Sequence, residues 1–457
     1  MTPAAAGTPA SEVAPEAEGA VPPKGLLLGY ASGSLSMGVW VTLPGLLLLF
    51  FLTNVTGASP ALAGLALFLP KIIDIVTHPW FGTLSDRQRR RRGNRRRMMW
   101  IGLLLSIAMV ITFSVPASIT GAGAALWVAG FYIAGNLLFA SFQVPYLTIP
   151  SDLEISYFQR TRVMTYRNVL LTIGLLIVGT VAPLLVKSGE RVDYVRMAAV
   201  MGIAMIVFGA IAIKCISRLG HMMSPPAAPD QAHMSLVQGV KRALSDRNFR
   251  MLVLSYLLTV SVTHIFLAGA PYYAKYHFNS AGLASLLVGA FLGPAVIAGP
   301  IWMMISKRIG KQRGILICQA TFAVCAALMF FGPKIGLVPT LAIVVVLGIS
   351  FSGMQLFAYS MLPDVARSAG RESSQAASFT GVWTATEATG TAFGPYIYSV
   401  ILVVGGFVGS TSDENITQTP AALNALLVGF TLVPALVMFG AFLIQRNYRL
   451  DSIARRS

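Results

Sequence analysis

The sequence from Lys71 to Arg97, KIIDIVTHPWFGTLSDRQRRRRGNRRR, joins two unlike segments. It begins inside an apolar stretch that nevertheless holds a lysine, an aspartate and a histidine. It ends in eleven residues, Arg87 to Arg97, of which eight are arginine. Dense positive charge directly after an apolar segment is typical of a helix that leaves a membrane on its cytoplasmic side.

The composition of the whole chain agrees with a membrane protein. Of its 457 residues, 55% are hydrophobic and 11% are charged, and the mean hydropathy is +0.70. Soluble proteins carry roughly a quarter charged residues. Apolar runs of about 20 residues, long enough to cross a bilayer as helices, recur along the chain, and no sustained alternation indicates membrane strands. The three cysteines, Cys215, Cys318 and Cys325, show no metal or disulfide spacing.

These runs predict an all-α polytopic protein with twelve transmembrane helices. Basic residues gather in alternate loops, which places both termini in the cytoplasm and explains the net charge of +17 without a nucleic-acid partner. The opposite loops and their flanks hold only a few basic residues. The predicted spans are 26–53, 60–84, 98–117, 122–149, 163–186, 194–217, 250–274, 281–306, 312–332, 337–362, 376–406 and 421–445.

The spans fall into two groups of six. We expect a disordered cytoplasmic tail over 1–24, a six-helix bundle over 25–218, a polar cytoplasmic linker over 219–248, a second bundle over 249–446 and a cytoplasmic tail over 447–457. The first 23 residues lack the basic start and apolar core of a signal peptide.

The two groups repeat each other. PWFGTLSDR, from Pro79, aligns with PIWMMISKR, from Pro300, at an offset of 221 residues, and YLTIPSD (146–152) matches YSMLPD (359–364). At the same offset, Lys71, Asp74 and His78 correspond to apolar or small residues. Paired six-span halves suit a transporter that binds its substrate between them.

These motifs resemble the major facilitator superfamily. More narrowly, KIIDIVTHPWFGTLSDR, VPYLTIPSDLEISYFQRTRVMTYRN and SMLPDVARSAGRESSQAASFTGVW resemble the glycoside–pentoside–hexuronide:cation symporter family, which includes melibiose permease. The resemblance covers most of residues 25–450. It implies the major facilitator fold, two pseudo-symmetric six-helix bundles that alternately open to either side.

Lys71, Asp74 and His78 are spaced i, i+3 and i+7, which places them on one helical face. A charge at the bilayer centre costs at least ~2.5 kcal/mol, so the group is either a self-neutralising Lys71–Asp74 pair or a cation or proton site. The resemblance implies that Lys71 and Asp74 lie at the family's cation site. His78 stands where the family has a second aspartate, and Ala140 where it has a threonine ligand. Asp74 and Thr77 remain as oxygen ligands, and the histidine favours a proton over sodium, or uncoupled transport.

The resemblance also implies a sugar site. Arg167 matches the family's sugar-binding arginine, whereas Gly38 and Gln143 replace two carboxylates. Arg167 as an interface anchor, and packing roles for the aromatic and histidine candidates, remain alternatives. The predicted substrate-binding residues are Gln143, Tyr146, Arg167, His264, Trp383 and Tyr30.

Glu387 is a further ionisable residue in an apolar span. The second and eleventh helices face each other in this superfamily, so Glu387 could approach Lys71 or His78. With Lys71 charged and both acids ionised, the formal charge is −1, and one proton brings it to zero. A carboxyl that simply stays protonated in an apolar setting is the alternative.

The arginine-rich loop predicts a cytoplasmic gate. In the superfamily, acidic and basic residues in such loops hold neighbouring helix ends in one conformation, and a lipid-headgroup patch is a compatible second role. The predicted gate or latch residues are Asp86, Arg87, Arg95, Arg96, Asp152, Arg160, Arg162, Asp364 and Arg371.

The function could be that of an enzyme, a receptor or a transporter. The sequence contains no nucleophile–base spacing, metal motif or nucleotide loop, so an enzyme is not expected, and no cofactor is expected beyond a coupling H⁺ or Na⁺. A non-transporting receptor would not need charges on one helical face. We therefore expect a monomeric secondary transporter in the plasma (inner) membrane. Its substrate is a small solute, a sugar or glycoside foremost, with a non-sugar amphiphile such as a lysolipid, or uncoupled facilitation, as the alternatives.

Overall fold

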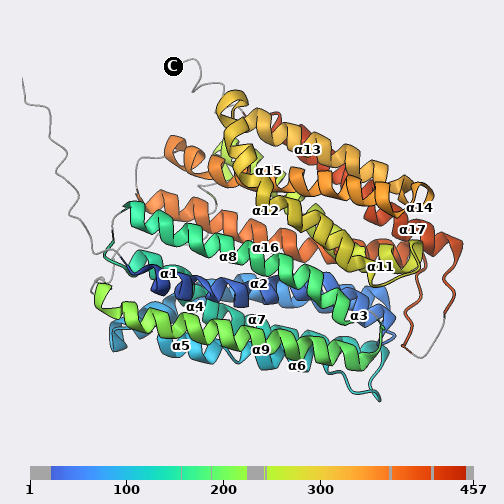
Figure 1. The fold of residues 1–457 in the computed structure, drawn as a ribbon, viewed down its shortest axis with the longest axis horizontal. Helices are drawn as coiled ribbons and strands as arrows, with labels where there is room; N and C mark the ends of the chain where they lie inside the picture. Colours follow the sequence, from blue (N-terminus) through green and yellow to red (C-terminus); the bar gives the residue numbers. More distant parts are fainter. Residues whose placement is uncertain are drawn as a thin grey trace, which may run out of the picture.

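The computed structural model describes residues 22–155, 157–186, 188–223, 241, 244–369, 373–412 and 416–448. The first predicted tail, most of the linker and the end of the second tail lie outside them. Figure 1 shows long helices that run side by side, with the helices up to α9 in one group and those from α11 onward in the other.

The first half of the described chain consists of six helical spans. The first span is divided, because Pro44 lies at the start of a π-helical segment and cannot donate the regular backbone bond. Some predicted ends differ from the observed ones: the second helix continues to Arg92 instead of ending at residue 84. The elements are α1 (Lys24–Ala31), α2 (Gly33–Leu43), η1 (Pro44–Leu48), α3 (Leu49–Asn54), α4 (Pro60–Arg92), α5 (Arg96–Gly102), α6 (Leu105–Phe113), α7 (Gly121–Asp152), α8 (Tyr157–Leu185), α9 (Arg191–Arg218) and η2 (Leu219–Met222).

The second half repeats this order. Its second helix, α12, ends at Gly310 (φ 82°) as α4 ends at Gly93 (φ 68°), since a glycine adopts positive φ without a Cβ clash. The elements are α11 (Arg247–His277), α12 (Leu283–Ile309), α13 (Lys311–Leu328), η3 (Met329–Phe331), α14 (Gly332–Ile335), α15 (Leu337–Ala369), α16 (Ser373–Val404), α17 (Pro420–Phe430) and α18 (Leu432–Gln445).

The lengths of these helices fit a bilayer. Within the described residues, eleven helical segments are long and apolar enough to cross a membrane, and α16, with 32 residues, supplies the twelfth. Many large apolar side chains face outward, among them Val76, Ile203 and Ile297, each more than 60% exposed. Such a surface is stable in lipid rather than in water.

The halves meet along three helix pairings: α4 with α16, α8 with α12, and the first span with α11. At the end of the molecule opposite the arginines, hydrogen bonds join the halves. Thr53 bonds Tyr272 through their hydroxyls at 2.6 Å, and the Asn54 carboxamide oxygen accepts from Lys275 Nζ at 3.2 Å. The backbone of Gly57 donates to the Ser410 carbonyl at 3.1 Å. We call this end the closed end.

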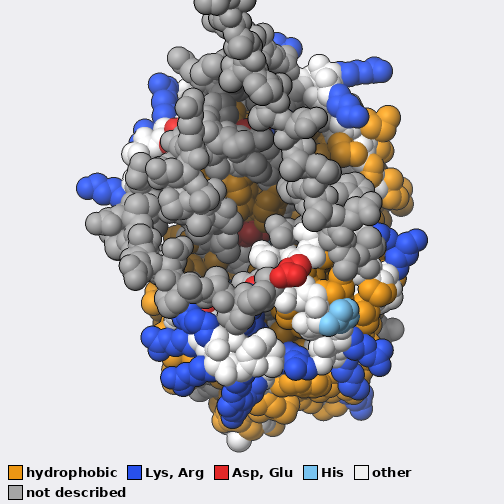
Figure 2. Space-filling view, turned by 90° about the vertical axis from the view of Figure 1, so that its left-hand side faces the viewer, with side chains coloured by type: hydrophobic (Ala, Val, Ile, Leu, Met, Phe, Trp, Pro, Cys, Tyr) orange, Lys and Arg blue, Asp and Glu red, His pale blue; other side chains and the backbone are white. Residues whose placement is uncertain are grey.

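The arginine-rich end differs. Figure 2 looks onto this end and shows Lys and Arg around its rim, with a hollow in the middle that has hydrophobic side chains in its depth. The ion pairs here that join described residues are formed within one half, as with Arg89–Asp152 and Lys311–Asp364.

Candidate functional site

The centre of α4 brings Lys71, Asp74 and His78 together, as their spacing predicts. Lys71 Nζ lies 3.4 Å from Asp74 Oδ2, and His78 Nδ1 lies 3.2 Å from Asp74 Oδ1. The side chains of Lys71 and Asp74 are 11% and 5% exposed, and that of His78 is 30% exposed. One carboxylate therefore faces two basic groups in a largely buried place.

Helix α7 completes the surroundings of Lys71. Its Nζ donates to Asn136 Oδ1 at 3.4 Å and lies 5.7 Å above the Tyr132 ring. The same Asn136 oxygen accepts from Trp40 Nε1 of α2 at 3.1 Å. Asn136 was not among the predicted site residues, although an asparagine within the apolar run FYIAGNLLFA indicates a buried polar contact.

His78 connects the charged group to a predicted substrate residue. Its Nδ1 lies 2.8 Å from the Asp74 carbonyl oxygen, and its Nε2 lies 3.1 Å from Gln143 Oε1. Both partners are acceptors, so this arrangement requires an N–H on each ring nitrogen, as in the imidazolium. With a neutral ring, Gln143 would instead have to turn its NH₂ group toward His78.

The oxygen ligands considered for sodium are not assembled around Asp74. The Thr77 hydroxyl donates to the carbonyls of Ile73 and Asp74 at 2.9 and 3.2 Å, within its own helix. Ala140 of α7 is fully buried and carries no ligand atom. Sodium normally takes several oxygens, so this set is a poor match for it.

Glu387 of α16 lies in a second polar cluster. Its carboxylate accepts from the Tyr359 hydroxyl at 2.9 Å and from the Tyr256 hydroxyl at 3.4 Å, instead of meeting Lys71 or His78. Trp383 stacks on Tyr256 with ring centroids 4.0 Å apart. The residues of this cluster all belong to the second half, and the two tyrosines were not among the predicted site residues.

Arg167 of α8 faces this cluster from the first half. Its guanidinium lies close enough for its charge to act on the Glu387 carboxylate. Its buried Nε has no hydrogen-bond partner among the described groups. Arg167 and Glu387 are thus two ionisable groups of opposite type, one in each half.

Three other predicted substrate residues are engaged in packing. Tyr30 and Tyr146 stack at 4.7 Å, and each hydroxyl donates to the other residue's backbone carbonyl. His264 Nδ1 donates to the Val260 carbonyl at 2.9 Å. The Cβ and backbone of His264 pack closely against Gly394 of α16, where an added Cβ would lie 2.4 Å from His264 Cβ. Their predicted role in binding stays a prediction.

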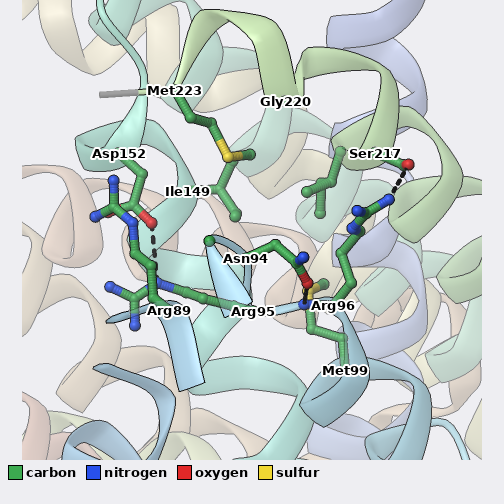
Figure 3. A pocket seen from close by; sticks show the side chains of 12 residues that line it. Arg89, Asn94, Arg95, Arg96, Met99, Ile149, Asp152, Ser217, Gly220 and Met223 are labelled. Carbon is green, nitrogen blue, oxygen red and sulfur yellow. Dashed lines mark hydrogen bonds and ion pairs between the residues drawn. The ribbon is translucent and has the colours of Figure 1, made fainter. Parts of the chain in front are cut away.

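The predicted gate residues form a network at the arginine-rich end (Figure 3). Asp152 accepts from Arg95 Nε at 2.9 Å and from Arg89 at 2.5 Å. Arg95 also donates to Asp86 and to Ser85, each at 2.7 Å. Arg89 and Ser85 were not among the predicted gate residues. The sequence does not distinguish Arg89 from the other arginines of the run.

The remaining gate candidates vary in their contacts. Arg96 donates to the Ser217 hydroxyl, Arg162 lies 5.8 Å from the Tyr166 ring, and Lys311 pairs with Asp364 in the second half. Arg87 is exposed. The side chain of Arg160 and all of Arg371 lie outside the described residues.

Comparison with known proteins places this geometry in a family. The profile described as MFS/sugar transport protein matches residues 29–452. The isoprimeverose transporter of Lactiplantibacillus pentosus is 25% identical over 93% of this chain and 88% of its own. The putative glycoside/cation symporter YagG of Escherichia coli (strain K12) is 23% identical over 93% of this chain and 91% of its own.

Solved structures support the same fold. The crystal structure of a bacterial homologue of the human lysosomal transporter Spinster, inward-facing and unoccupied, superposes with a TM-score of 0.65 at 15% identity, over 93% of this chain and 97% of the other. The expected major facilitator fold with twelve helices in two bundles is confirmed. The chain belongs to the MFS/sugar transport protein family, whose members are transporters and not enzymes.

Proposed function

We propose that this protein carries a sugar or glycoside across the membrane by alternating access, and that its transport is coupled to a proton. Family membership and the named cargo of its relatives support the solute class. Gln143 on α7 and Arg167 on α8 supply groups that can bond the hydroxyls of such a solute.

The observation that carries the coupling is the bond between His78 Nε2 and Gln143 Oε1 at 3.1 Å. When His78 holds a proton on each nitrogen, it fixes the Gln143 carboxamide with its NH₂ group free to donate elsewhere. Loss of the Nε2 proton removes that donor, and the carboxamide must turn over. Protonation thereby determines which hydrogen-bonding group Gln143 offers to a solute.

Charge balance alone does not carry the coupling. The sequence-based sum counted Lys71, Asp74 and Glu387 and gave −1 without a proton. With Arg167 added to the sum, the formal charge of Lys71, Asp74, Arg167 and Glu387 is already zero without a proton on His78. The proton assignment therefore rests on the His78–Gln143 contact and on the poor match of the site to sodium.

We infer further that the arginine-rich end is cytoplasmic, together with both termini, because basic loops stay on that side. The closed end would then face outward, and the hollow of Figure 2 would open to the cytoplasm. On this view the molecule is inward-facing, resides in the plasma membrane and works as a monomer. The domain limits proposed from the sequence, 25–218 and 249–446, place one six-helix bundle on each side of the hollow.

Uptake into proteoliposomes tests the proposal. A panel containing isoprimeverose, β-glycosides, uronides and a lysolipid is offered under an inward pH gradient, an inward sodium gradient or neither. We expect a neutral glycoside to accumulate under the pH gradient only, and a protonophore to abolish accumulation. Accumulation driven by sodium at constant pH would reject proton coupling. Uptake of the lysolipid alone would reject a sugar or glycoside as the substrate.

A further inference from the structure

Apart from the hollow between the halves, a cavity lies inside the first half at its arginine-rich end (Figure 3). Its volume is about 270 Å³, against roughly 30 Å³ for one water in the liquid. The ends of α4 and α7, the start of α5 and the end of α9 form its walls. Its polar lining includes Arg89, Asn94, Arg95, Arg96, Asp152 and Ser217.

The charges around this cavity do not balance. Three guanidinium groups meet two carboxylates, because Asp152 accepts from Arg89 and Arg95, and Asp86 accepts from Arg95 behind the wall. The side chain of Arg96 bonds the neutral hydroxyl of Ser217. Among these three arginines and two aspartates, one positive charge is in excess, and it lies in a recess that shields it partly from water.

The remainder of the lining indicates what kind of anion fits. Ile149 and Met223 form an apolar wall of the cavity, and Met99 lies beside Arg96 (Figure 3). One turn after Arg96, Trp100 is 45% exposed on the outer surface of α5, and Ile101 beside it is 47% exposed. Tryptophan is enriched at the level of lipid headgroups, so Arg96 lies at the depth of a phosphate layer.

We propose that this cavity binds a phosphate diester carrying one negative charge, held by Arg96 with help from Asn94 and Ser217. A guanidinium binds phosphate through paired, charge-assisted bonds. A single negative charge matches the single surplus positive charge, and the apolar wall accommodates the carbon atoms next to the phosphate. A phospholipid of the inner leaflet and a soluble phosphate compound share this chemistry.

Bound there, the phosphate would connect the turn after α4 to the end of α9. It would also compete with Asp152 for the neighbouring arginines. Occupancy would thereby change the strength of the Arg89–Asp152 and Arg95–Asp152 pairs, which hold the end of α4 and the start of α5 to α7. This inference does not depend on which solute the protein carries.

Thermal unfolding of the purified full-length protein in a neutral detergent tests the site. The additives are phosphatidylglycerol, phosphatidylcholine and inorganic phosphate, each at several concentrations. We expect phosphatidylglycerol to raise the unfolding temperature most, because the choline of phosphatidylcholine places a positive charge near the arginines. Arg96→Ala should bind about tenfold more weakly, since it loses a charge-assisted bond. Arg90→Ala, an exposed arginine of the same run outside the cavity, should keep the full shift.

A shift that inorganic phosphate reproduces, and that Arg96→Ala loses, would support the same site with a soluble occupant. Equal shifts from both lipids, or equal losses in Arg90→Ala and Arg96→Ala, would overturn the proposal in favour of diffuse attraction to the arginine run. If Arg96→Ala does not fold, Arg96→Lys decides by the same criteria, since it keeps the charge but not the paired geometry.

Discussion

Replacing Lys71 by methionine should expose how His78 responds to the charge of Asp74. The substitution keeps the length and apolar stem of the side chain but removes the ammonium that lies 3.4 Å from Asp74 Oδ2. The carboxylate, 5% exposed, is then left with His78 as its nearby basic group. Leaving a buried charge without its partner costs roughly 3–5 kcal/mol.

The remaining partner determines the pH dependence. His78 Nδ1 is 3.2 Å from Asp74 Oδ1, where two unit charges interact by about 5 kcal/mol at an effective dielectric constant of 20, before desolvation is subtracted. The imidazolium stabilises the folded variant, so the compensation is present at low pH and is lost as the pH rises. One proton changes the free energy of unfolding by about 1.4 kcal/mol per pH unit. Over the interval from about pH 6.5, where free histidine titrates, to pH 8, this amounts to roughly 2 kcal/mol.

We therefore expect the free energy of unfolding of Lys71→Met to be about 2 kcal/mol lower at pH 8 than at pH 5.5. The assay is the thermal unfolding midpoint in detergent, each variant being measured at both pH values. Leu292→Met, at the equivalent position of the second half, controls for the methionine itself. Equal midpoints of Lys71→Met at the two pH values, or a difference that persists in Lys71→Met/His78→Gln, would refute the reasoning.

Three further outcomes are expected. His78→Asn should make the initial rate of solute uptake nearly constant between pH 5.5 and 8; a pH profile like that of the unmodified protein would place the proton elsewhere. Asp152→Asn should lower the unfolding free energy by about 2 kcal/mol, because two arginines lose their buried negative partner and one of them faces an NH₂ group, and an unchanged midpoint would contradict the network. Gly348→Ala should destabilise the protein by more than about 1 kcal/mol, because its Cβ would lie 2.0 Å from the Phe291 carbonyl oxygen. Gly381→Ala, whose Cβ would meet no atom within 4 Å, should leave the stability unchanged. Equal midpoints for the two variants would show that α12 and α15 can separate at no cost.

The spans and the charged face of α4 were predictable because each depends on local periodicity. The length of a transmembrane helix follows from the length of its apolar run. The i, i+3, i+7 spacing places three residues on one helical face, whichever helices pack against it. The bond from His78 to Gln143 was not predictable, since it depends on how α4 and α7 are rotated against each other. Contacts of that kind are set by packing across distant parts of the chain.

The arginine run shows the same limit in another form. Helix α4 continues to Arg92, so its helical phase turns Arg89 toward Asp152 and leaves Arg87 exposed. The end of α4 could not be predicted, because it falls within a run of identical arginines. Glu387 is a third case: its tyrosine partners come from α11 and α15, separated from it by 131 and 28 positions.

The closed end is built mainly from hydroxyl, carboxamide and backbone groups, with Lys275 as a charged member. Hydrogen bonds between neutral groups respond little to dissolved ions, whereas ion pairs weaken as ionic strength rises. In the proposed orientation, the uncharged contacts face a medium whose salinity and acidity vary with the surroundings. The ion pairs face the cytoplasm, whose ionic composition the cell regulates. Opening toward the outside would then proceed at much the same free energy in fresh and in saline water.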